Sequence, residues 1–175
     1  GSSIDTAKGI NILRYNEGPI LRFADFSAEM QPSPGLIAIP TTAGTGSEMS
    51  DGLVITGDDH VKHPILANKA MTSYAIVDPQ LMTGMPPHLT ASTGMDALCH
   101  ALESYTSSAA NMLTDQICEG NISSILRWLP RAVADGSDLE ARSHMAAASS
   151  ISGWMLCYGH THAGHSVAHI LGAEC

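Results

Sequence analysis

The sequence has few charged residues, and basic ones are the scarcest of them. Asp, Glu, Lys and Arg make up 14% of the 175 residues, with 8 Lys and Arg against 17 Asp and Glu and a formal net charge of −9. Because nucleic acids and anionic membranes are bound largely through Lys and Arg, this balance argues against both as partners. A chain that is 44% hydrophobic with so few charges buries much of its surface, so we expect a homo-oligomer.

Paired cysteines, long apolar runs and a leader sequence are also missing. The four cysteines are widely spaced and form no C-x-x-C pair, which is typical of free thiols in a reducing cytoplasm. No stretch reaches the roughly 18 apolar residues of a transmembrane helix. Residues 1–8 lack the basic and apolar segments of a signal peptide. These absences predict a cytoplasmic protein.

Residues 1–87 have the pattern of an α/β domain. Short apolar, β-branched runs bounded by Gly or Pro predict strands at 35–40, 52–56 and 74–79. Residues 5–13 predict a helix ahead of these strands. Alternation of a helix with short buried strands is the pattern of an α/β domain.

The pattern changes at Met85-Pro86-Pro87, and this proline pair predicts the boundary between two domains, 1–87 and 88–175. Beyond it only helical periodicity is present, and helices are expected over 90–105, 114–134, 137–158 and 163–171. Ser137 and Glu140 have the spacing of a capping box at the start of the third of these helices. Gly172 is expected to end the fourth.

Two potential metal ligands lie one helical turn apart in the first of these helices. Asp96 and His100 are four positions apart, so a helix places the carboxylate and the imidazole on one face, within reach of one cation. The intervening Ala97, Leu98 and Cys99 are apolar, and a buried carboxylate is costly unless it is paired or ligated. An ordinary Asp–His hydrogen bond would also satisfy the pair.

A histidine-rich segment strengthens the metal interpretation. Four histidines fall within residues 160–169, and His165 and His169 are again one helical turn apart. Carboxylate and imidazole ligands without paired thiolates suit a catalytic Fe²⁺ or Zn²⁺ site that keeps a position open for substrate. A polar loop followed by a core histidine is the other interpretation, and spacing alone does not decide between them.

Two segments have the composition of cofactor-binding loops. Gly1-Ser2 leads into the first predicted helix, whose free backbone amides and positive dipole end suit a pyrophosphate. Residues 40–48 follow a predicted strand, and their small side chains let a ligand approach the backbone. Thr41, Thr42 and Thr45 offer hydroxyls there for phosphate or ribose. A simple helix cap and a plain strand-to-helix connection are the alternatives.

Together these motifs resemble the iron-containing (group III) alcohol dehydrogenase family, along nearly the whole chain and in the family's order. The stretch P-T-T-A-G-T-G-S-E at 40–48 is a hallmark of that family. The other matching stretches are G-S-S-I-D-T-A-K at 1–8, D-P-Q-L at 78–81, M-P-P at 85–87, G-M-D-A-L-C-H-A-L-E at 94–103 and H-S-V-A-H-I-L-G at 165–172. The first of these resembles the end of a phosphate loop without its earlier glycines, so the chain is expected to be an internal fragment.

The resemblance implies a fold and a set of metal ligands. The family has a Rossmann-like α/β N-terminal part followed by an all-α C-terminal domain, a dehydroquinate synthase-like two-domain architecture with metal and nicotinamide between the domains. Carried over position by position, Asp96, His100 and His165 correspond to metal ligands, and a fourth ligand, a histidine, is expected beyond Cys175. His169 corresponds to a further histidine beside the active site and is expected to relay a proton.

The resemblance also implies cofactor contacts. The corresponding positions are Gly1 and Ser2 for the pyrophosphate, Thr41, Thr42 and Thr45 for other parts of the cofactor, and Lys62 for the ribose. The cofactor is expected to be NAD or NADP and the metal Fe²⁺ or Zn²⁺, and the residues present fix neither choice.

The expected activity is hydride transfer between the nicotinamide and a small alcohol or aldehyde. Two members of the same superfamily are alternatives, a maleylacetate reductase and a glycerol dehydrogenase. Maleylacetate reductases typically lack the Asp at position 96, and glycerol dehydrogenases carry a different threonine loop, so both fit the sequence less well. A non-catalytic metal-binding fragment would account for the histidines but not for the threonine loop.

Overall fold

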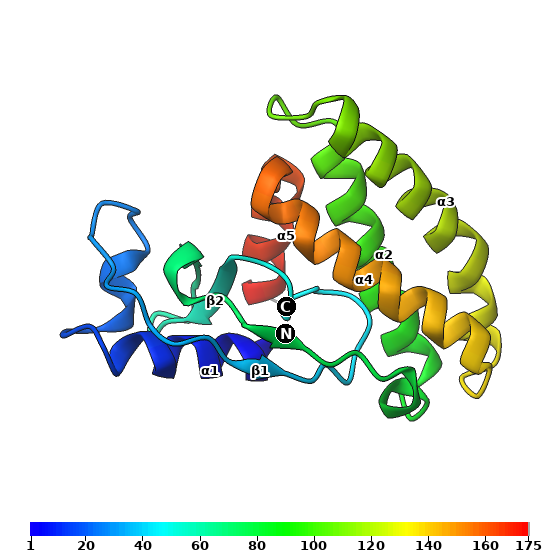
Figure 1. Ribbon diagram of the computed structural model, residues 1–175, viewed down its shortest axis with the longest axis horizontal. Helices are drawn as coiled ribbons and strands as arrows, with labels where there is room; N and C mark the ends of the chain where they lie inside the picture. The colour runs from blue at the N-terminus through cyan, green and yellow to red at the C-terminus, as the bar shows by residue number, and fades with distance from the viewer. Residues whose placement is uncertain (175) are drawn as a thin grey trace.

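The computed structural model describes residues 1–174 and has an α/β part joined to a helical part (Figure 1). The α/β part contains α1 Ser2–Leu13, β1 Ile37–Ala38, β2 Gly52–Thr56, β3 Lys62–Leu66 and β4 Tyr74–Ala75, with short 3₁₀ helices η1 Ile20–Phe23, η2 Asn68–Ala70 and η3 Pro79–Met82. The helical part contains α2 Pro87–Tyr105, α3 Met112–Ala134, α4 Leu139–Gly159 and α5 Ala163–Glu174. In Figure 1 helix α1 lies at the lower left, α2, α3 and α4 lie at the right, and α5 lies between them.

Helix α1 packs against the antiparallel hairpin of β2 and β3. Ile12 from the helix and Leu53 and Ile65 from the hairpin are at most 2% exposed and form the centre of a small apolar core. The expected helix at 5–13 is confirmed and begins earlier, at Ser2, because Gly1 already accepts the first helical hydrogen bond from the amide of Asp5.

Lys8 fastens α1 to the start of β2. Its side chain is 1% exposed, and its ammonium donates to the carbonyl oxygens of Ser50 and Gly52, each at 2.9 Å. Burial lowers the pKa of Lys8 below its ordinary value, because the charged form loses hydration.

The strands differ from the sequence-based expectation in number and length. The runs at 35–40 and 74–79 contain strands of only two residues each, which pair in parallel with Ile37 opposite Tyr74. The strand at 52–56 is confirmed. Its antiparallel partner at 62–66 was missed, because Pro64 argues against a strand; the proline is tolerated here opposite Val54 in a two-stranded ladder, where it lies at an edge.

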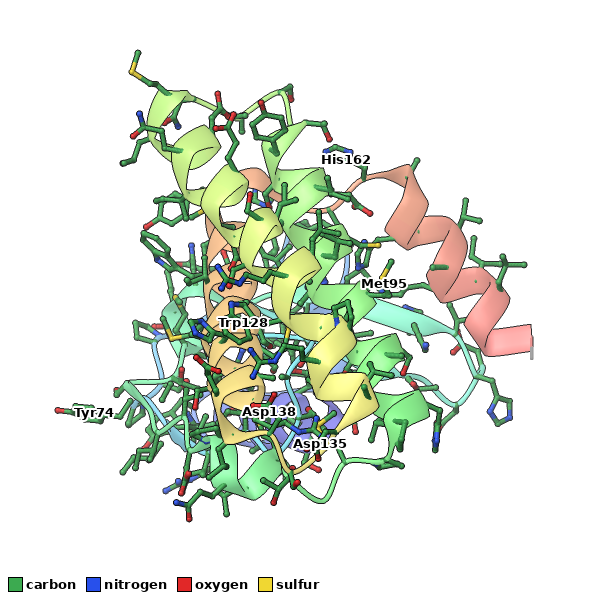
Figure 2. All side chains as sticks on the ribbon, turned by 90° about the vertical axis from the view of Figure 1, so that its right-hand side faces the viewer. Tyr74, Met95, Trp128, Asp135, Asp138 and His162 are labelled. Atoms are coloured by element: carbon green, nitrogen blue, oxygen red, sulfur yellow. The ribbon has the colours of Figure 1, made fainter. Side chains whose placement is uncertain are left out.

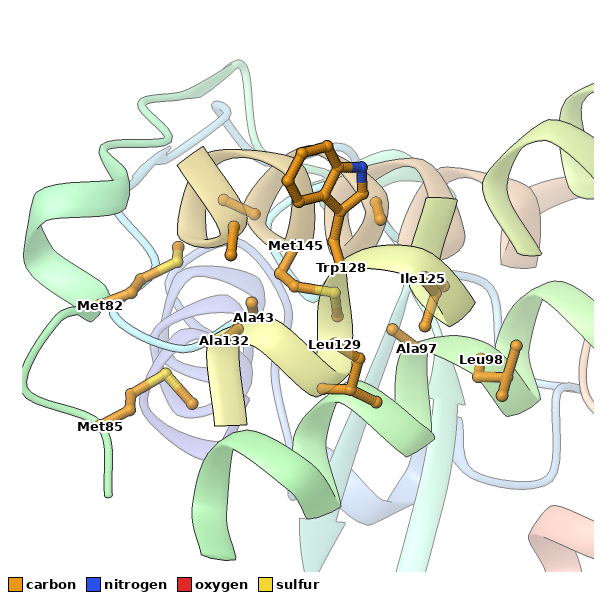
Figure 3. Close-up of a cluster of buried hydrophobic side chains, with 13 residues drawn as sticks. Ala43, Met82, Met85, Ala97, Leu98, Ile125, Trp128, Leu129, Ala132 and Met145 are labelled. Carbon is orange, nitrogen blue, oxygen red and sulfur yellow. The ribbon is translucent and has the colours of Figure 1, made fainter. Parts of the chain in front are cut away.

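Helices α2, α3 and α4 pack against one another around a second apolar core (Figure 3). Figure 3 shows Trp128, Leu129 and Ile125 of α3 facing Met145 of α4 and Ala97 of α2. Small residues on α4, including Ala146 and Ala148, are buried at the contact and let the helix axes approach closely. This core fixes α2, the helix that carries Asp96 and His100, relative to its neighbours.

The capping box expected at Ser137 and Glu140 is wrong. The hydroxyl of Ser137 instead donates to Asp135 at 2.6 Å, and the Glu140 carboxylate accepts from Arg131 at 2.9 Å. The N-cap of α4 is Asp138, whose carboxylate accepts from the amide of Ala141 at 3.0 Å. Because Asp is as good an N-cap as Ser, the cap lies at Asp138, one position after the expected Ser137.

The other helix ends differ by a few residues from the expected ones. Helix α2 begins at Pro87, and α3 begins at Met112, where Asn111 and Thr114 form a reciprocal capping box that the sequence analysis missed. Gly172 does not end α5, which continues to Glu174.

A buried arginine holds the junction between the two parts. Arg142 of α4 is 1% exposed and donates to the carbonyl of Gly136 at 3.0 Å, the hydroxyl of Thr90 at 2.9 Å and the carbonyl of Met85 at 3.1 Å. These three acceptors come from the α3–α4 turn, from α2 and from the chain just before α2. Figure 2 shows the α3–α4 turn at Asp135 and Asp138, at one end of the helix bundle.

Within residues 1–174, no helix is long and apolar enough to cross a membrane. Cys99, Cys118 and Cys157 are free, as expected from their spacing, and Cys175 lies outside the described residues.

Candidate metal and cofactor site

Three side chains from two helices converge on one point. Asp96 and His100 lie one turn apart on α2, and His165 comes from the first turn of α5. The Asp96 Oδ1 atom lies 3.6 Å from His100 Nε2 and 3.4 Å from His165 Nε2, and one ligand atom from each of the three residues lies within 4.8 Å of the others. The imidazoles of His100 and His165 stack with their ring centroids 4.7 Å apart.

These distances and donor types fit one divalent cation. Ligand atoms about 2.1 Å from a single tetrahedral ion lie about 3.4 Å from one another, close to the separations of Asp96 Oδ1 from the two imidazole nitrogens. The alternative, a simple Asp–His hydrogen bond, would account for only one of the two histidines. It would leave the nitrogen of the other histidine facing the same point without a partner. One carboxylate and two imidazoles are ligands that Fe²⁺ and Zn²⁺ share.

The electrostatics of the three residues reflect their crowding. Burial lowers the pKa of His100, which is 6% exposed. Burial also disfavours the charged form of Asp96, but His165 and the charge of His100 hold the pKa of that carboxyl below its usual value. Interaction with Asp96, opposed by burial and reinforced by a hydrogen bond to Glu103, raises the pKa of His165 to about 9. Asp96 thus attracts both imidazoles, whereas the charge of His165 disfavours a charge on His100.

The threonine loop at 40–48 runs between α2 and α4. A side chain at Gly44 would meet the Cβ of Thr93 in α2 at 2.5 Å, so the loop backbone lies directly on that helix. Gly46 has a φ of 60° and lies against Gly153 of α4, where a Cβ would be 2.4 Å from the Gly153 Cα. Only glycine fits this conformation and this contact.

Two hydrogen bonds from buried or half-buried side chains hold the end of the loop. The carboxylate of Glu48, which is 2% exposed, accepts from the hydroxyl of Ser150 in α4 at 2.7 Å. The carboxylate of Asp5 in α1 accepts from the Ser47 hydroxyl and, at 3.1 Å, from the amide of Val54. The loop is therefore fastened to both parts of the protein.

The structure brings two of the expected cofactor segments together. A side chain at Gly1 would lie 3.3 Å from the Cγ2 atom of Thr45, so the start of α1 touches the threonine loop. Ser2 and Thr41 are exposed, while Thr42 and Thr45 are half-buried. Exposed hydroxyls and the first amides of α1 thus lie on adjoining segments, as an extended phosphate and ribose ligand needs.

Lys62 lies against α5, the helix that carries His165 and His169. Lys62 begins β3 and points toward α5, where a side chain at Gly172 would be 3.5 Å from its Nζ atom. The His169 ring meets the His165 ring edge to face, with centroids 5.9 Å apart. Burial, together with the charges of His165 and Lys62, lowers the pKa of His169.

Comparison with known proteins decides the family. Residues 1–79 match the family model described as iron-containing alcohol dehydrogenase, and residues 90–175 match the model of the C-terminal part of the Fe-containing alcohol dehydrogenase family. The chain belongs to the iron-containing alcohol dehydrogenase family. The resemblance seen in the sequence motifs is thereby confirmed.

Relatives of this chain match it from end to end. Alcohol dehydrogenase 4 of Schizosaccharomyces pombe is 43% identical over 98% of this chain and 41% of its own length. The structure of an alcohol dehydrogenase from Oenococcus oeni has a TM-score of 0.93 and 38% identity, covering 99% of this chain and 46% of that one. Sulfoacetaldehyde reductase from Bifidobacterium kashiwanohense, solved in complex with NAD⁺, has a TM-score of 0.89 and 34% identity, covering 97% and 46%.

These matches confirm the predicted fold class, with an α/β part followed by an all-helical part. The chain spans less than half the length of each of these relatives.

Three residues of the site were not singled out from the sequence. Glu48 and Ser150 are 102 positions apart, so no local pattern could have joined them. Glu103 lies on α2 seven positions after Asp96, a spacing that returns to the same helix face and was available as a signal. Its partner, His165, is 62 positions away.

Proposed function

We propose that this chain is part of an NAD(P)-dependent alcohol dehydrogenase that oxidises a small alcohol or reduces the corresponding aldehyde. In this proposal residues 1–87 contribute to the dinucleotide-binding domain and residues 88–175 to the metal-binding domain. The observation that carries the proposal is the convergence of Asp96, His100 and His165, with all three ligand atoms within 4.8 Å, in a chain of this family.

Each part of the site has a proposed task. Asp96, His100 and His165 would hold a divalent cation, Fe²⁺ or Zn²⁺. A cation there supplies a Lewis acid that lowers the pKa of the substrate hydroxyl or polarises the aldehyde carbonyl. His169, whose ring lies against that of His165, is the proposed proton relay between the substrate oxygen and solvent.

The cofactor-binding part is proposed from the loop and the start of α1. Gly1, Ser2 and the first amides of α1 would bind the pyrophosphate, and Thr41, Thr42 and Thr45 would donate hydroxyl hydrogen bonds to the cofactor. A nicotinamide held by these residues would supply the hydride acceptor for alcohol oxidation and the hydride donor for aldehyde reduction. NAD⁺ in the sulfoacetaldehyde reductase relative supports a nicotinamide dinucleotide as the cofactor. Lys62, beside α5, is proposed to face the ribose.

The test combines metal content with turnover. The protein is purified without oxygen, and NAD(H)- and NADP(H)-linked oxidation of a primary alcohol and a diol is followed with and without added Fe²⁺ or Zn²⁺. We expect Asp96→Ala and His100→Ala to abolish both metal retention and turnover. His88→Ala, which changes an exposed histidine at the start of the same helix, is the matched control and should keep both.

Two outcomes would contradict the proposal. Normal turnover in Asp96→Ala or His100→Ala would remove the metal from the mechanism. Turnover that survives complete metal removal would favour the maleylacetate reductase alternative and would leave the three residues with a structural role.

A further inference from the structure

Glu103 connects the two helices that supply the three clustered residues. It follows Asp96 by seven and His100 by three positions on α2, so all three side chains share one helix face. One carboxylate oxygen, Oε1, lies 2.7 Å from Nδ1 of His165, a hydrogen bond. The other, Oε2, accepts from the backbone amide of His162.

The hydrogen bond to Nδ1 determines which nitrogen of His165 is free. A divalent cation binds histidine in its neutral form, which carries one proton, so metal binding displaces the second proton of His165. Because the Glu103 carboxylate can only accept, the proton that remains lies on Nδ1. The Nε2 atom is then bare, and it is this atom that lies 3.4 Å from Asp96 Oδ1. A divalent cation binds a bare imidazole nitrogen, so the tautomer that Glu103 selects is the one competent to bind metal.

The second oxygen of Glu103 holds the turn that brings α5 to α2. Between α4 and α5 the chain reverses at His160, which has a φ of 58°. Figure 2 shows His162 at this turn, where the chain enters α5. Gly164 passes close to the carboxylate, since a Cβ there would be 3.3 Å from Oε1. Glu103 therefore fixes both the ring of His165 and the first turn of its helix.

Among the described residues, the other imidazole of the cluster has no such support. The Nδ1 atom of His100 is buried without a side-chain partner, and its ring is held by stacking on His165, by its place on α2 and by the backbone of Gly44 in the threonine loop. The two histidines are thus oriented by different means. Loss of Glu103 should disturb His165 and leave His100 in place.

We propose that Glu103 is a positioning residue for the metal site, which orients His165 and selects its Nε2 nitrogen for binding a divalent cation. This inference rests on the metal site of the proposed function. It concerns a residue that acts through His165 and does not itself touch the cation or the substrate.

The first experiment measures metal affinity directly. Zn²⁺ is titrated into the metal-free protein against a chromophoric chelator of known affinity. We expect Glu103→Gln and Glu103→Ala to weaken Zn²⁺ binding by about 10- to 100-fold, the usual effect of removing a carboxylate behind a metal-bound histidine. Glu119→Gln is the matched control, because Glu119 is an exposed carboxylate that accepts a side-chain hydrogen bond from Tyr105 at 3.0 Å. The Zn²⁺ affinity of this variant should equal that of the original protein.

The second measurement separates orientation from general stability. In the Zn²⁺-loaded protein, ¹⁵N-resolved NMR of the histidine rings should show a proton on Nδ1 of His165, and this resonance should be lost or shifted in Glu103→Gln. Equal Zn²⁺ affinity in the two Glu103 variants and the original protein would overturn the proposal. So would an unprotonated Nδ1 in the loaded original protein, a result that needs no variant to fold.

The controls distinguish this inference from the proposed function. If the original protein binds no Zn²⁺, or if Asp96→Ala binds it equally well, the metal site itself is refuted, and the role of Glu103 falls with it. If Asp96→Ala loses Zn²⁺ while the Glu103 variants keep it, only the role of Glu103 is refuted.

Discussion

Replacement of Arg142 by Met should destabilise the protein strongly, although the residue is outside the candidate site. Its guanidinium is buried and has three hydrogen-bond acceptors, two of them backbone carbonyls, at 2.9–3.1 Å. Met retains much of the apolar stem of the side chain but none of its donors. The perturbation thus removes the hydrogen bonds that join the junction before α2 to the turn between α3 and α4.

The expected cost follows from the acceptors left behind. A buried acceptor without a donor costs about 1–3 kcal/mol. The buried carbonyl of Met85 keeps only the Thr90 hydroxyl at 3.5 Å as a poor donor, whereas the half-buried carbonyl of Gly136 can turn to water. The desolvation of the guanidinium, which the variant no longer suffers, offsets part of the loss. We therefore expect the free energy of unfolding to fall by roughly 2 kcal/mol.

Urea unfolding followed by circular dichroism measures this loss. For an m-value of about 2 kcal/mol/M, the midpoint should fall by about 1 M. Arg127→Met is the control, because Arg127 is exposed and its guanidinium lies over the Trp128 ring at 5.0 Å, an interaction worth about 0.5–1 kcal/mol. A loss below about 1 kcal/mol in Arg142→Met would refute the reasoning.

Two further predictions concern the contact of the threonine loop with α4 and the buried lysine of α1. Gly153→Ala should lower the free energy of unfolding by about 2 kcal/mol or more, because the new Cβ would lie 2.1 Å from the carbonyl oxygen of Gly46. The control is Gly120→Ala, where a Cβ would meet no atom within 4 Å and should raise the free energy of unfolding by up to about 1 kcal/mol. A urea titration of the two variants measures both changes. Because burial lowers the folded-state pKa of Lys8, the folded protein binds fewer protons there than the unfolded chain, so stability should rise with pH in the interval below the ordinary value of 10.5. Thermal unfolding across this interval should show a shallower rise in Lys8→Met, and an identical slope would contradict the assignment.

The sequence predicted those parts of the site that depend on local periodicity. Asp96 and His100 are one turn apart on a helix, and the helix is present, so their shared face followed from spacing alone. His165 joins them through a tertiary contact between α2 and α5, which no local pattern contains, and only the family resemblance placed it there. Glu103 was overlooked because a carboxylate on a helix surface is most often solvated.

The errors in secondary structure have the same physical origin. Strand β3 exists because Leu53 and Ile65 pair across the hairpin and bury together, which outweighs the poor strand propensity of Pro64. The start of α4 was displaced because the Asp135 carboxylate takes the Ser137 hydroxyl, and this leaves Asp138 to cap the helix. At β3 the cross-strand partner decided between two locally acceptable conformations, and at α4 a carboxylate two residues away did so.

The two-residue parallel ladder of β1 and β4 has a consequence for the order of folding. It joins Ile37 to Tyr74, 37 positions along the chain, whereas the hairpin closes between Thr56 and Lys62, only 6 positions apart. Loop-closure entropy scales with the logarithm of loop length and makes the longer closure costlier by roughly 1.5 kcal/mol. The hairpin and α1 are therefore expected to form first, and the ladder to close over them once the intervening chain is already compact.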